Sequence, residues 1–327
     1  MANDREIPIL PADGAEPPPP EPVKPREEPI QHGPSPRQTL NYIRSLLEAF
    51  GLDPKSKLGQ NFLIDLNLVD LIVRASEITT EDAVLEVGTG TGTLTARLAE
   101  VAGHVVTIEI DKTFHPVAKQ IVGHRPNVTY LLGDCLERKS VLNPDMMHAW
   151  REAGKRPGCK RRKLVANLPY VIATPLISNL LVDDPDIERM VVMVQWEIAE
   201  RLCAKESTKD YNALSVLVQS IADVEIVRKV LPSNFYPRPK VDSAIVMIRP
   251  NAEKRAAVGD VVKFRSFLRN LYIHRRKNLR QALSGWPTGR REKTDVDAIL
   301  AQLEIDGTKR AEALDLKEHL RLSTAFA

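Results

Sequence analysis

The sequence is poor in residues that would cross-link the chain or anchor it in a membrane. Its 327 residues include three cysteines, Cys135, Cys159 and Cys203, which are far apart and form no Cys-x-x-Cys pair. Their odd number and spacing argue against a disulfide framework and against a zinc cluster, so no metal site is expected. No apolar run approaches the about 18 residues of a membrane span, which excludes a transmembrane protein. A reducing, cytoplasmic setting fits both absences.

Charge and proline are unevenly distributed along the chain. Residues 1–36 hold 11 of the 24 prolines, with three basic and seven acidic side chains, whereas the formal charge of the whole chain is +3. This composition predicts a disordered, acidic, proline-rich tail, and it lacks the apolar core of a secretory signal and the basic character of a transit peptide. The remaining chain therefore carries a net charge of +7.

From residue 37 onward, two hydrophobic periods alternate. Helical spacing is found at residues 39–50, 67–76, 94–101 and 116–123, and short apolar strands are expected at 83–87, 104–110, 128–132, 164–167, 190–195, 224–230 and 243–248. Such alternation predicts an α/β domain over residues 37–250, with a mostly parallel sheet covered by helices on both faces. Residues 258–271, 278–284, 295–303 and 311–325 then read as helices, which predicts a small all-helical domain over 251–327.

Two stretches carry most of the basic excess. Residues 138–163 hold nine basic and two acidic side chains, and Gly154, Pro157 and Gly158 favour a loop there. Residues 263–280 hold seven basic side chains and no acidic one, interleaved with aromatic residues. A single charged run is usually a solvated face, but two such runs favour a polyanionic partner such as nucleic acid.

A glycine-rich turn between a strand and a helix is the strongest local signal for a ligand. The glycines fall at Gly88, Gly90 and Gly92, and Thr93 stands where a dinucleotide-binding fingerprint would need another glycine. The spacing resembles the loop that binds S-adenosylmethionine. Glu109 and Asp134 end the next two predicted strands, so three strand ends are expected to meet at one nucleoside-sized crevice.

The tetrapeptide Asn167-Leu168-Pro169-Tyr170, at another predicted strand end, suits methylation of an aromatic amine. The nitrogen lone pair of such an amine is delocalised and poorly nucleophilic. The Asn167 side-chain oxygen and the Leu168 carbonyl could accept both amine hydrogens and return electron density to the nitrogen. Pro169 would hold the turn, and Tyr170 would offer a flat face for a base, which must be flipped out of its stack to reach this site.

At these motifs the chain resembles the small-subunit ribosomal RNA adenine dimethyltransferases, from about residue 55 to the C-terminus. The matching stretches are Leu58-Gly59-Gln60-Asn61-Phe62-Leu63, the glycine turn, Asn167 to Tyr170 with Ala173-Thr174-Pro175, residues 197–202, residues 214–217, residues 235–243 and Arg275-Arg276-Lys277-Asn278-Leu279-Arg280. The resemblance implies a Rossmann-like class I methyltransferase fold. It also implies transfer of two methyl groups to each of two adjacent adenines near the 3′ end of small-subunit rRNA, in immature 30S particles, by a monomeric enzyme.

The resemblance also implies roles for individual residues. Contacts to S-adenosylmethionine are expected from Asn61, Leu63, Gly88, Gly90, Glu109, Asp134 and Asn167. The target base would be held by Asn167, Leu168, Pro169, Tyr170 and Phe235, with the two aromatic rings on opposite faces of the base. Contacts to rRNA phosphates are expected from Lys240, Arg275, Arg276, Lys277 and Arg280, within a C-terminal RNA-binding domain.

The chain departs from the family pattern at several positions. Thr89 stands where the family usually has proline, Trp196 where it commonly has lysine, and Asn212 where a glycine is common. The last two put local RNA contacts in doubt. Residues 138–163 are long for the family, and we expect them to form an added basic RNA-binding loop.

Three other functions compete with this interpretation. A large-subunit adenine methyltransferase of the antibiotic-resistance type shares Gln60 to Leu63, but that type typically has isoleucine where this chain has Leu168. A non-catalytic nucleic-acid-binding factor of the same fold is disfavoured by the intact Glu109 and the intact tetrapeptide at Asn167. A nicotinamide oxidoreductase is disfavoured by Thr93 and by the lack of an evident hydride-site histidine.

Overall fold

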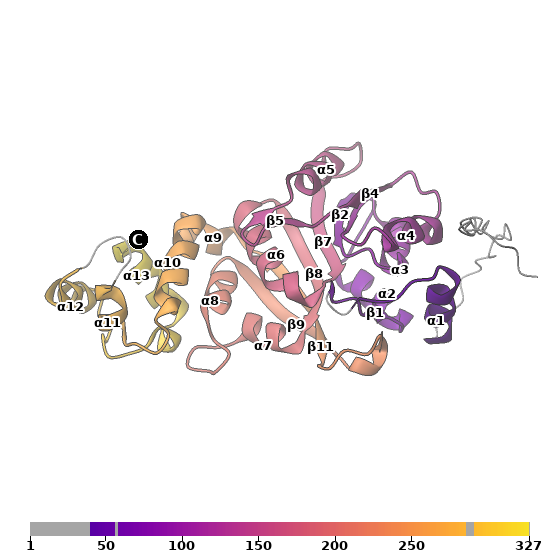
Figure 1. The fold of residues 1–327 in the computed structure, drawn as a ribbon. Helices are drawn as coiled ribbons and strands as arrows, with labels where there is room; N and C mark the ends of the chain where they lie inside the picture. The colour runs from indigo at the N-terminus through magenta and orange to yellow at the C-terminus, as the bar shows by residue number, and fades with distance from the viewer. Residues whose placement is uncertain (1–39, 56–57, 286–290, 327) are drawn as a thin grey trace, which may run out of the picture. The chain divides into compact units, whose positions relative to one another are not determined.

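A single mixed sheet forms the centre of the molecule in the computed structural model, which describes residues 40–55, 58–285 and 291–326. The sheet has the strand order β4-β3-β2-β7-β8-β11-β9 (Figure 1). Its strands are β2 (Asp82–Val87), β3 (His104–Glu109), β4 (Val128–Leu132), β7 (Arg161–Asn167), β8 (Ile187–Gln195), β9 (Ala222–Val230) and β11 (Ser243–Pro250). Strands β4, β3, β2, β7 and β8 are parallel, and β11 runs antiparallel to both of its neighbours. The mostly parallel sheet and each of its strands were predicted, with boundaries off by a few residues.

Helices cover both faces of the sheet, because successive strand residues point to opposite sides. The helices before β11 are α1 (Leu40–Ala49), α2 (Leu66–Ala75), α3 (Thr93–Val101), α4 (Phe114–Val122), α5 (Pro144–Gly154), α6 (Tyr170–Asp183), α7 (Trp196–Cys203) and α8 (Ala213–Gln219). On β2, Val84 packs in the core beneath α2 and α3, whereas Ala83 and Leu85 pack in the core beneath α5, α6 and α8. This is the doubly covered architecture that buried, apolar parallel strands require.

Two small sheets lie beside the main one. Strand β1 (Phe62–Leu63) pairs with β10 (Phe235–Tyr236), and β5 (Leu136–Arg138) pairs with β6 (Val141–Leu142). The first pair joins segments that are more than 170 residues apart in the sequence. Neither pair was predicted, since strands of two or three residues have no detectable period.

The chain after β11 is helical, as predicted. It comprises α9 (Ala252–Val258), α10 (Val261–Ile273), α11 (Leu279–Ser284), α12 (Lys293–Gln302), a 3-10 turn at Ala311–Ala313 and α13 (Leu316–Phe326). Gly259, with a φ of 69°, separates α9 from α10, so the expected single helix over 258–271 begins later and follows another helix. The described part of the chain forms one compact unit, and α10 packs against α8 (Figure 1). An independent domain boundary at residue 250 stays a prediction.

The basic stretch at residues 138–163 is not the expected loop. Asn143 caps α5 by accepting a hydrogen bond from the Met146 amide at 3.0 Å, and Pro144 occupies the first turn. Trp150 is fully buried, and its indole N–H donates to the Ala83 carbonyl at 2.9 Å. The expectation was wrong because the apolar side chains of 146–153 follow a helical period, which outweighs the glycines and proline that come after them.

Most basic side chains of this stretch neutralise acidic groups within the fold. Arg162 makes two hydrogen bonds to Asp184, at 2.6 and 2.7 Å. Arg161 pairs with the buried Asp82 at 2.8 Å, and the buried Lys163 lies 3.2 Å from the same carboxylate. Most of the stretch is therefore a structural layer, and an RNA-binding role for its remaining basic side chains stays a prediction.

The aromatic residues of the second basic stretch are also structural. Phe264 and Phe267 are 2% and 1% exposed and lie on the core side of α10. The hydroxyl of Tyr272 donates to the Ala311 carbonyl at 3.3 Å. These rings hold α10 against the core, so their interleaving with basic residues does not form a stacking surface.

The tail predicted for residues 1–36 lies outside the described residues. Among the helices that are described, none combines the length and apolar character needed to cross a membrane.

Candidate active site

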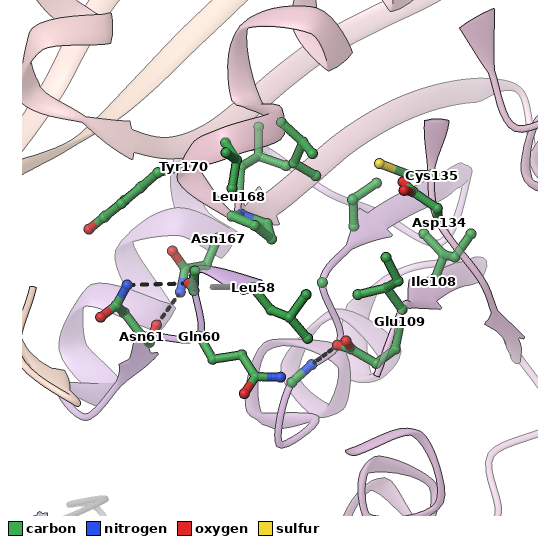
Figure 2. A pocket seen from close by; sticks show the side chains of 18 of the residues that line it. Leu58, Gln60, Asn61, Ile108, Glu109, Asp134, Cys135, Asn167, Leu168 and Tyr170 are labelled. Carbon is green, nitrogen blue, oxygen red and sulfur yellow. Dashed lines mark hydrogen bonds between the residues drawn. The ribbon is translucent and has the colours of Figure 1, made fainter. Parts of the chain in front are cut away.

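A pocket of about 250 Å³ opens where the parallel strands end (Figure 2). Residues that follow β2, β3, β4 and β7 line it, together with segment 58–62, which lies ahead of β2 in the sequence. Parallel strands bring their carboxyl ends to one edge of the sheet, so side chains far apart in the sequence meet there. The predicted convergence of strand ends on one crevice is confirmed.

The glycine turn after β2 is shaped by close contacts on both sides. Gly88 and Gly90 have φ values of 85° and 55°, a region that other residues rarely adopt. A Cβ atom at Gly88 would lie 3.2 Å from Pro169, and one at Gly90 would lie 3.1 Å from the Phe62 ring. Glycine therefore lets the turn fit between the tetrapeptide and β1, and the Gly88 amide fixes it by donating to the Ile108 carbonyl at 2.9 Å.

Glu109 lies at the end of β3 with both carboxylate oxygens engaged. Its Oε2 accepts from the Gly90 amide at 2.8 Å (Figure 2), and its Oε1 accepts from the Asp111 amide at 2.9 Å. The side chain is 5% exposed, and burial raises its pKa. Each oxygen of a carboxylate has two lone pairs, so Glu109 keeps the capacity to accept hydrogen bonds from both hydroxyls of a ribose.

The next strand end supplies a polar group and an apolar surface. Asp134 lines the pocket, and its Oδ1 accepts from the Leu136 amide at 2.9 Å. Cys135 beside it is buried, and desolvation together with the Asp134 charge raises its pKa to about 12, so it stays a neutral thiol. Ile110, which is 46% exposed, lines the same part of the pocket. This arrangement suits an adenine: the Asp134 carboxylate can accept from the exocyclic amine, and Cys135 and Ile110 can pack against the ring.

The side chain of Asn167 is fixed in one orientation. Its amide nitrogen donates to the Asn61 carbonyl at 3.1 Å, and the Asn61 side chain donates to the Gly59 carbonyl at 3.2 Å (Figure 2). A carbonyl can only accept, so the NH₂ group of Asn167 must face Asn61. The oxygen of Asn167 is therefore the atom left to accept a hydrogen bond from a ligand.

The remainder of the tetrapeptide continues the same wall. Leu168, Pro169 and Tyr170 all line the pocket, and the Leu168 amide donates to the Met193 carbonyl of β8 at 3.1 Å. The Tyr170 hydroxyl lies 2.8 Å from the Ser243 hydroxyl, and burial raises its pKa. The ring is thus held by a neutral hydrogen bond at its far end, with its body at the pocket.

Two expected contact residues do not line this pocket. Phe235 is 3% exposed and pairs with Leu63 across the β1–β10 ladder, and both pack in the core beneath α2 and α3. Leu63 borders a smaller cavity of about 50 Å³ behind the glycine turn. Tyr170 therefore lines the pocket and Phe235 does not, and a place for Phe235 on the other face of the base stays a prediction.

Thr89, which replaces the usual proline of the turn, is held by a buried chain of hydrogen bonds. Its hydroxyl lies 2.6 Å from that of Thr107, which donates to Glu86 at 2.7 Å. Burial raises the pKa of Glu86 to about 8, so it is mostly neutral at pH 7. The turn is therefore fixed by hydrogen bonds instead of by a ring.

The sequence did not point to Asp111, which lies two residues after Glu109. Its Oδ2 accepts from the Lys55 ammonium and the Gln60 amide, both at 2.9 Å, while its own backbone amide donates to Glu109. Although burial opposes ionisation, hydrogen bonds from Thr113, Lys55 and Gln60 hold the pKa of Asp111 well below its usual range. Asp111 thus joins segment 58–62 to Glu109. The only signal in the sequence is that Asp111 lies two residues after Glu109, which was expected to bind the ligand.

The expected RNA-contacting residues fall into two groups. Arg275 pairs with Glu312 at 2.9 Å, and Arg280 pairs with Asp297 at 2.7 Å. The other group comprises Lys240, Arg276 and Lys277, which are exposed and have no ion pair among the described residues. The described part of the chain also contains no group of three or more histidine, cysteine or acidic side chains arranged for a metal ion.

Comparison with known proteins identifies close relatives. The family model described as Ribosomal RNA adenine dimethylase matches residues 51–321. A Ribosomal RNA small subunit methyltransferase A of Pediococcus pentosaceus is 38% identical over 280 residues, covering 85% of this chain and 92% of that protein. One from Pelotomaculum thermopropionicum is 37% identical over 287 residues, covering 87% and 95%.

Two solved structures share the fold over most of their length. A dimethyladenosine transferase from Plasmodium falciparum has a TM-score of 0.65 at 28% identity, covering 81% of this chain and 97% of that one. The 23S rRNA methyltransferase ErmE has a TM-score of 0.57 at 26% identity, covering 81% and 99%. The predicted Rossmann-like methyltransferase fold is confirmed.

We expect Asp111→Asn to weaken binding of S-adenosylmethionine while leaving the chemical step nearly intact. The substitution keeps the side-chain volume but replaces one carboxylate oxygen with an NH₂ group, which cannot accept hydrogen bonds from Lys55 and Gln60. Segment 58–62 therefore loses its link to Glu109. The KM for the cofactor should rise about tenfold, or about 1.4 kcal/mol, with kcat at saturation within about twofold. Steady-state kinetics would measure both constants.

Lys112→Ala, which removes an exposed neighbouring charge, serves as the control and should change neither constant. Gln60→Ala should reproduce the effect, and its combination with Asp111→Asn should be less than additive, since both act through one contact. An unchanged KM in a folded Asp111→Asn protein would contradict the role assigned to this carboxylate.

Proposed function

The chain belongs to the ribosomal RNA adenine dimethylase family, and we propose that it transfers methyl groups to the exocyclic amines of two adjacent adenosines near the 3′ end of small-subunit rRNA. The observation that carries this proposal is the fixed orientation of Asn167, whose amide group is held by Asn61 so that its oxygen faces the pocket. An acceptor aimed into a pocket beside an aromatic ring is what an adenine amine requires.

S-Adenosylmethionine would supply an activated methyl group on a sulfonium. The residues present suit its nucleoside part: Glu109 for the ribose hydroxyls, Asp134 for the adenine amine, and Ile110 and Cys135 for the ring faces. The glycine turn allows close approach of its backbone to the ligand. These residues account for binding of the nucleoside. None of them is needed as a strong base, because the sulfonium already activates the methyl group.

The chemical step depends on the nucleophilicity of the adenine amine. The Asn167 oxygen and the Leu168 carbonyl accept the two amine hydrogens, which localises the lone pair on nitrogen for an in-line attack on the methyl carbon. The N–C bond forms as the C–S bond breaks, and the nitrogen then loses one proton. Tyr170 supports one face of the base, while a stacking role for Phe235 requires its ring to leave the core.

The substrate is proposed to be small-subunit rRNA in immature 30S particles, with the protein acting as a monomer in the cytoplasm. Support comes from the two bacterial relatives named above, which carry the small-subunit name at 38% and 37% identity.

The direct test is transfer of labelled methyl groups from S-adenosylmethionine to immature small subunits and, separately, to large-subunit RNA. Nucleoside analysis should find dimethyladenosine at adjacent adenines of the small subunit only. Label confined to large-subunit RNA would refute the substrate assignment. Tight cofactor binding with no label on either RNA would support a non-catalytic binding factor.

Asn167→Ala should abolish most turnover while reducing cofactor affinity only moderately. The variant removes the side-chain acceptor and leaves the Leu168 carbonyl, so kcat should fall about 100-fold or more, as when one preorganised transition-state contact is lost. Single-turnover methylation with bound cofactor measures this step. Near-normal rates would remove Asn167 from the chemistry. The control is His148→Ala, which removes an exposed side chain on α5.

The C-terminal basic residues are proposed to hold rRNA phosphates. We expect those without an ion pair to contribute more to RNA binding than those that already have one. Arg276 and Lys277 are exposed without ion pairs among the described residues, whereas Arg275 and Arg280 already neutralise carboxylates. Arg276→Ala with Lys277→Ala should therefore weaken RNA binding and reduce the slope of log affinity against log salt by about 1.4. Arg280→Ala should change the slope less. Equal slopes for wild type and the double variant would exclude these residues from the interface.

A further inference from the structure

A second opening adjoins the pocket and shares part of its wall. This side groove has a volume of about 450 Å³ and is lined by Asp134, Leu136, Glu137, Arg138, Lys139, Val171, Ile172, Thr174 and Pro175. Asp134, Val171 and Ile172 also line the cofactor and base pocket, so the two spaces are adjacent. Val171, the residue after Tyr170, is 72% exposed, which leaves an apolar surface open beside the site proposed for the target base.

The charges of the side groove lie on the β5–β6 hairpin. Arg138 and Lys139 are exposed and have no ion pair among the described residues, in contrast to Arg161, Arg162 and Lys163 of the same basic stretch. Of the two acidic residues in the lining, Asp134 also belongs to the cofactor pocket, and Glu137 is exposed. The groove therefore combines two available cations with an apolar floor.

The backbone of the hairpin is held in place, whereas Arg138 and Lys139 form no ion pair within the described part of the chain. Asn179 of α6 is 3% exposed, and its Nδ2 donates to the Lys139 carbonyl at 3.2 Å. Its Oδ1 accepts from Arg265 of α10 at 2.9 Å. One buried amide thus joins the two basic stretches, 138–163 and 263–280, at the side groove.

We propose that the side groove receives the single-stranded RNA segment that flanks the flipped adenosine. Phosphates would lie against Arg138 and Lys139, and sugars or base faces against Val171 and Pro175. A base that leaves its stack to reach Tyr170 must carry its neighbours across the adjoining surface, since consecutive nucleotides are covalently linked. The groove would position the strand through its backbone, without reading its sequence. This inference rests on the function proposed above.

The test compares two double variants that each remove two positive charges from the same basic stretch. Arg138→Ala with Lys139→Ala removes the groove cations. Lys155→Ala with Arg156→Ala is the control, because Arg156 lies beside His104 at the amino end of β3, on the opposite edge of the sheet. Binding of a labelled, unmethylated RNA fragment from the 3′ end of small-subunit rRNA would be measured at several salt concentrations.

We expect the groove variant to bind RNA about tenfold more weakly and to lose about 1.4 from its salt slope, as two single-strand phosphate contacts would. Its affinity for S-adenosylmethionine and its thermal unfolding should match those of the control. Exchanging the cations, Arg138→Lys with Lys139→Arg, should keep the slope, and Glu137→Gln should tighten RNA binding by removing a like charge.

Identical slopes for the groove variant and the control would overturn the proposal, as would loss of binding in the charge-keeping exchange. This experiment measures RNA binding and not methyl transfer, so its result is independent of whether the proposed dimethylation is correct. If the wild type methylates neither rRNA but the groove variant alone loses salt-dependent binding, the dimethylation assignment is refuted and the groove stands.

Discussion

The parallel alignment of β4, β3, β2, β7 and β8 is the constraint on which the active site depends. It places the ends of four strands at one edge, so that the glycine turn, Glu109, Asp134 and Asn167 surround one space although they span 80 residues of sequence. The strands can be parallel only because helices on both faces bury them and provide the crossovers. Helix α5, whose Trp150 donates to β2, is therefore as necessary to the site as any residue that lines it.

Within that frame, hydrogen bonds to the backbone settle which atoms are available for chemistry. Asn167 is turned by the Asn61 carbonyl, and Glu109 is held by two amides. The Asn61 carbonyl belongs to segment 58–62, which Asp111 links to the end of β3 by accepting from Gln60 and donating to Glu109. A methyl-transfer site without a strong base relies on this preorganisation, because its contribution is to hold acceptors and aromatic surface where the amine needs them.

The use of basic side chains shows how little a charge count reveals about a surface. Both stretches looked like RNA-binding runs in the sequence, yet the fold commits Arg161, Arg162 and Lys163 to buried or partly buried carboxylates. Arg138, Lys139, Arg276 and Lys277 are left exposed. A cation that already neutralises a carboxylate has less to gain from a phosphate, so the partner of each side chain, and not its position in a run, decides its availability.

The sequence alone determined the sheet, the helical C-terminal part, the crevice and the tetrapeptide, because hydrophobic period and the turn chemistry of glycine and proline are local properties. It could not determine that residues 144–154 cover the sheet, that Phe235 is buried against Leu63, or that Asp111 links two walls of the pocket. These features arise from contacts between segments far apart in the sequence, in one case more than 170 residues. Only the tertiary structure decided them, since burial and hydrogen-bond partners exist only after such segments have packed together.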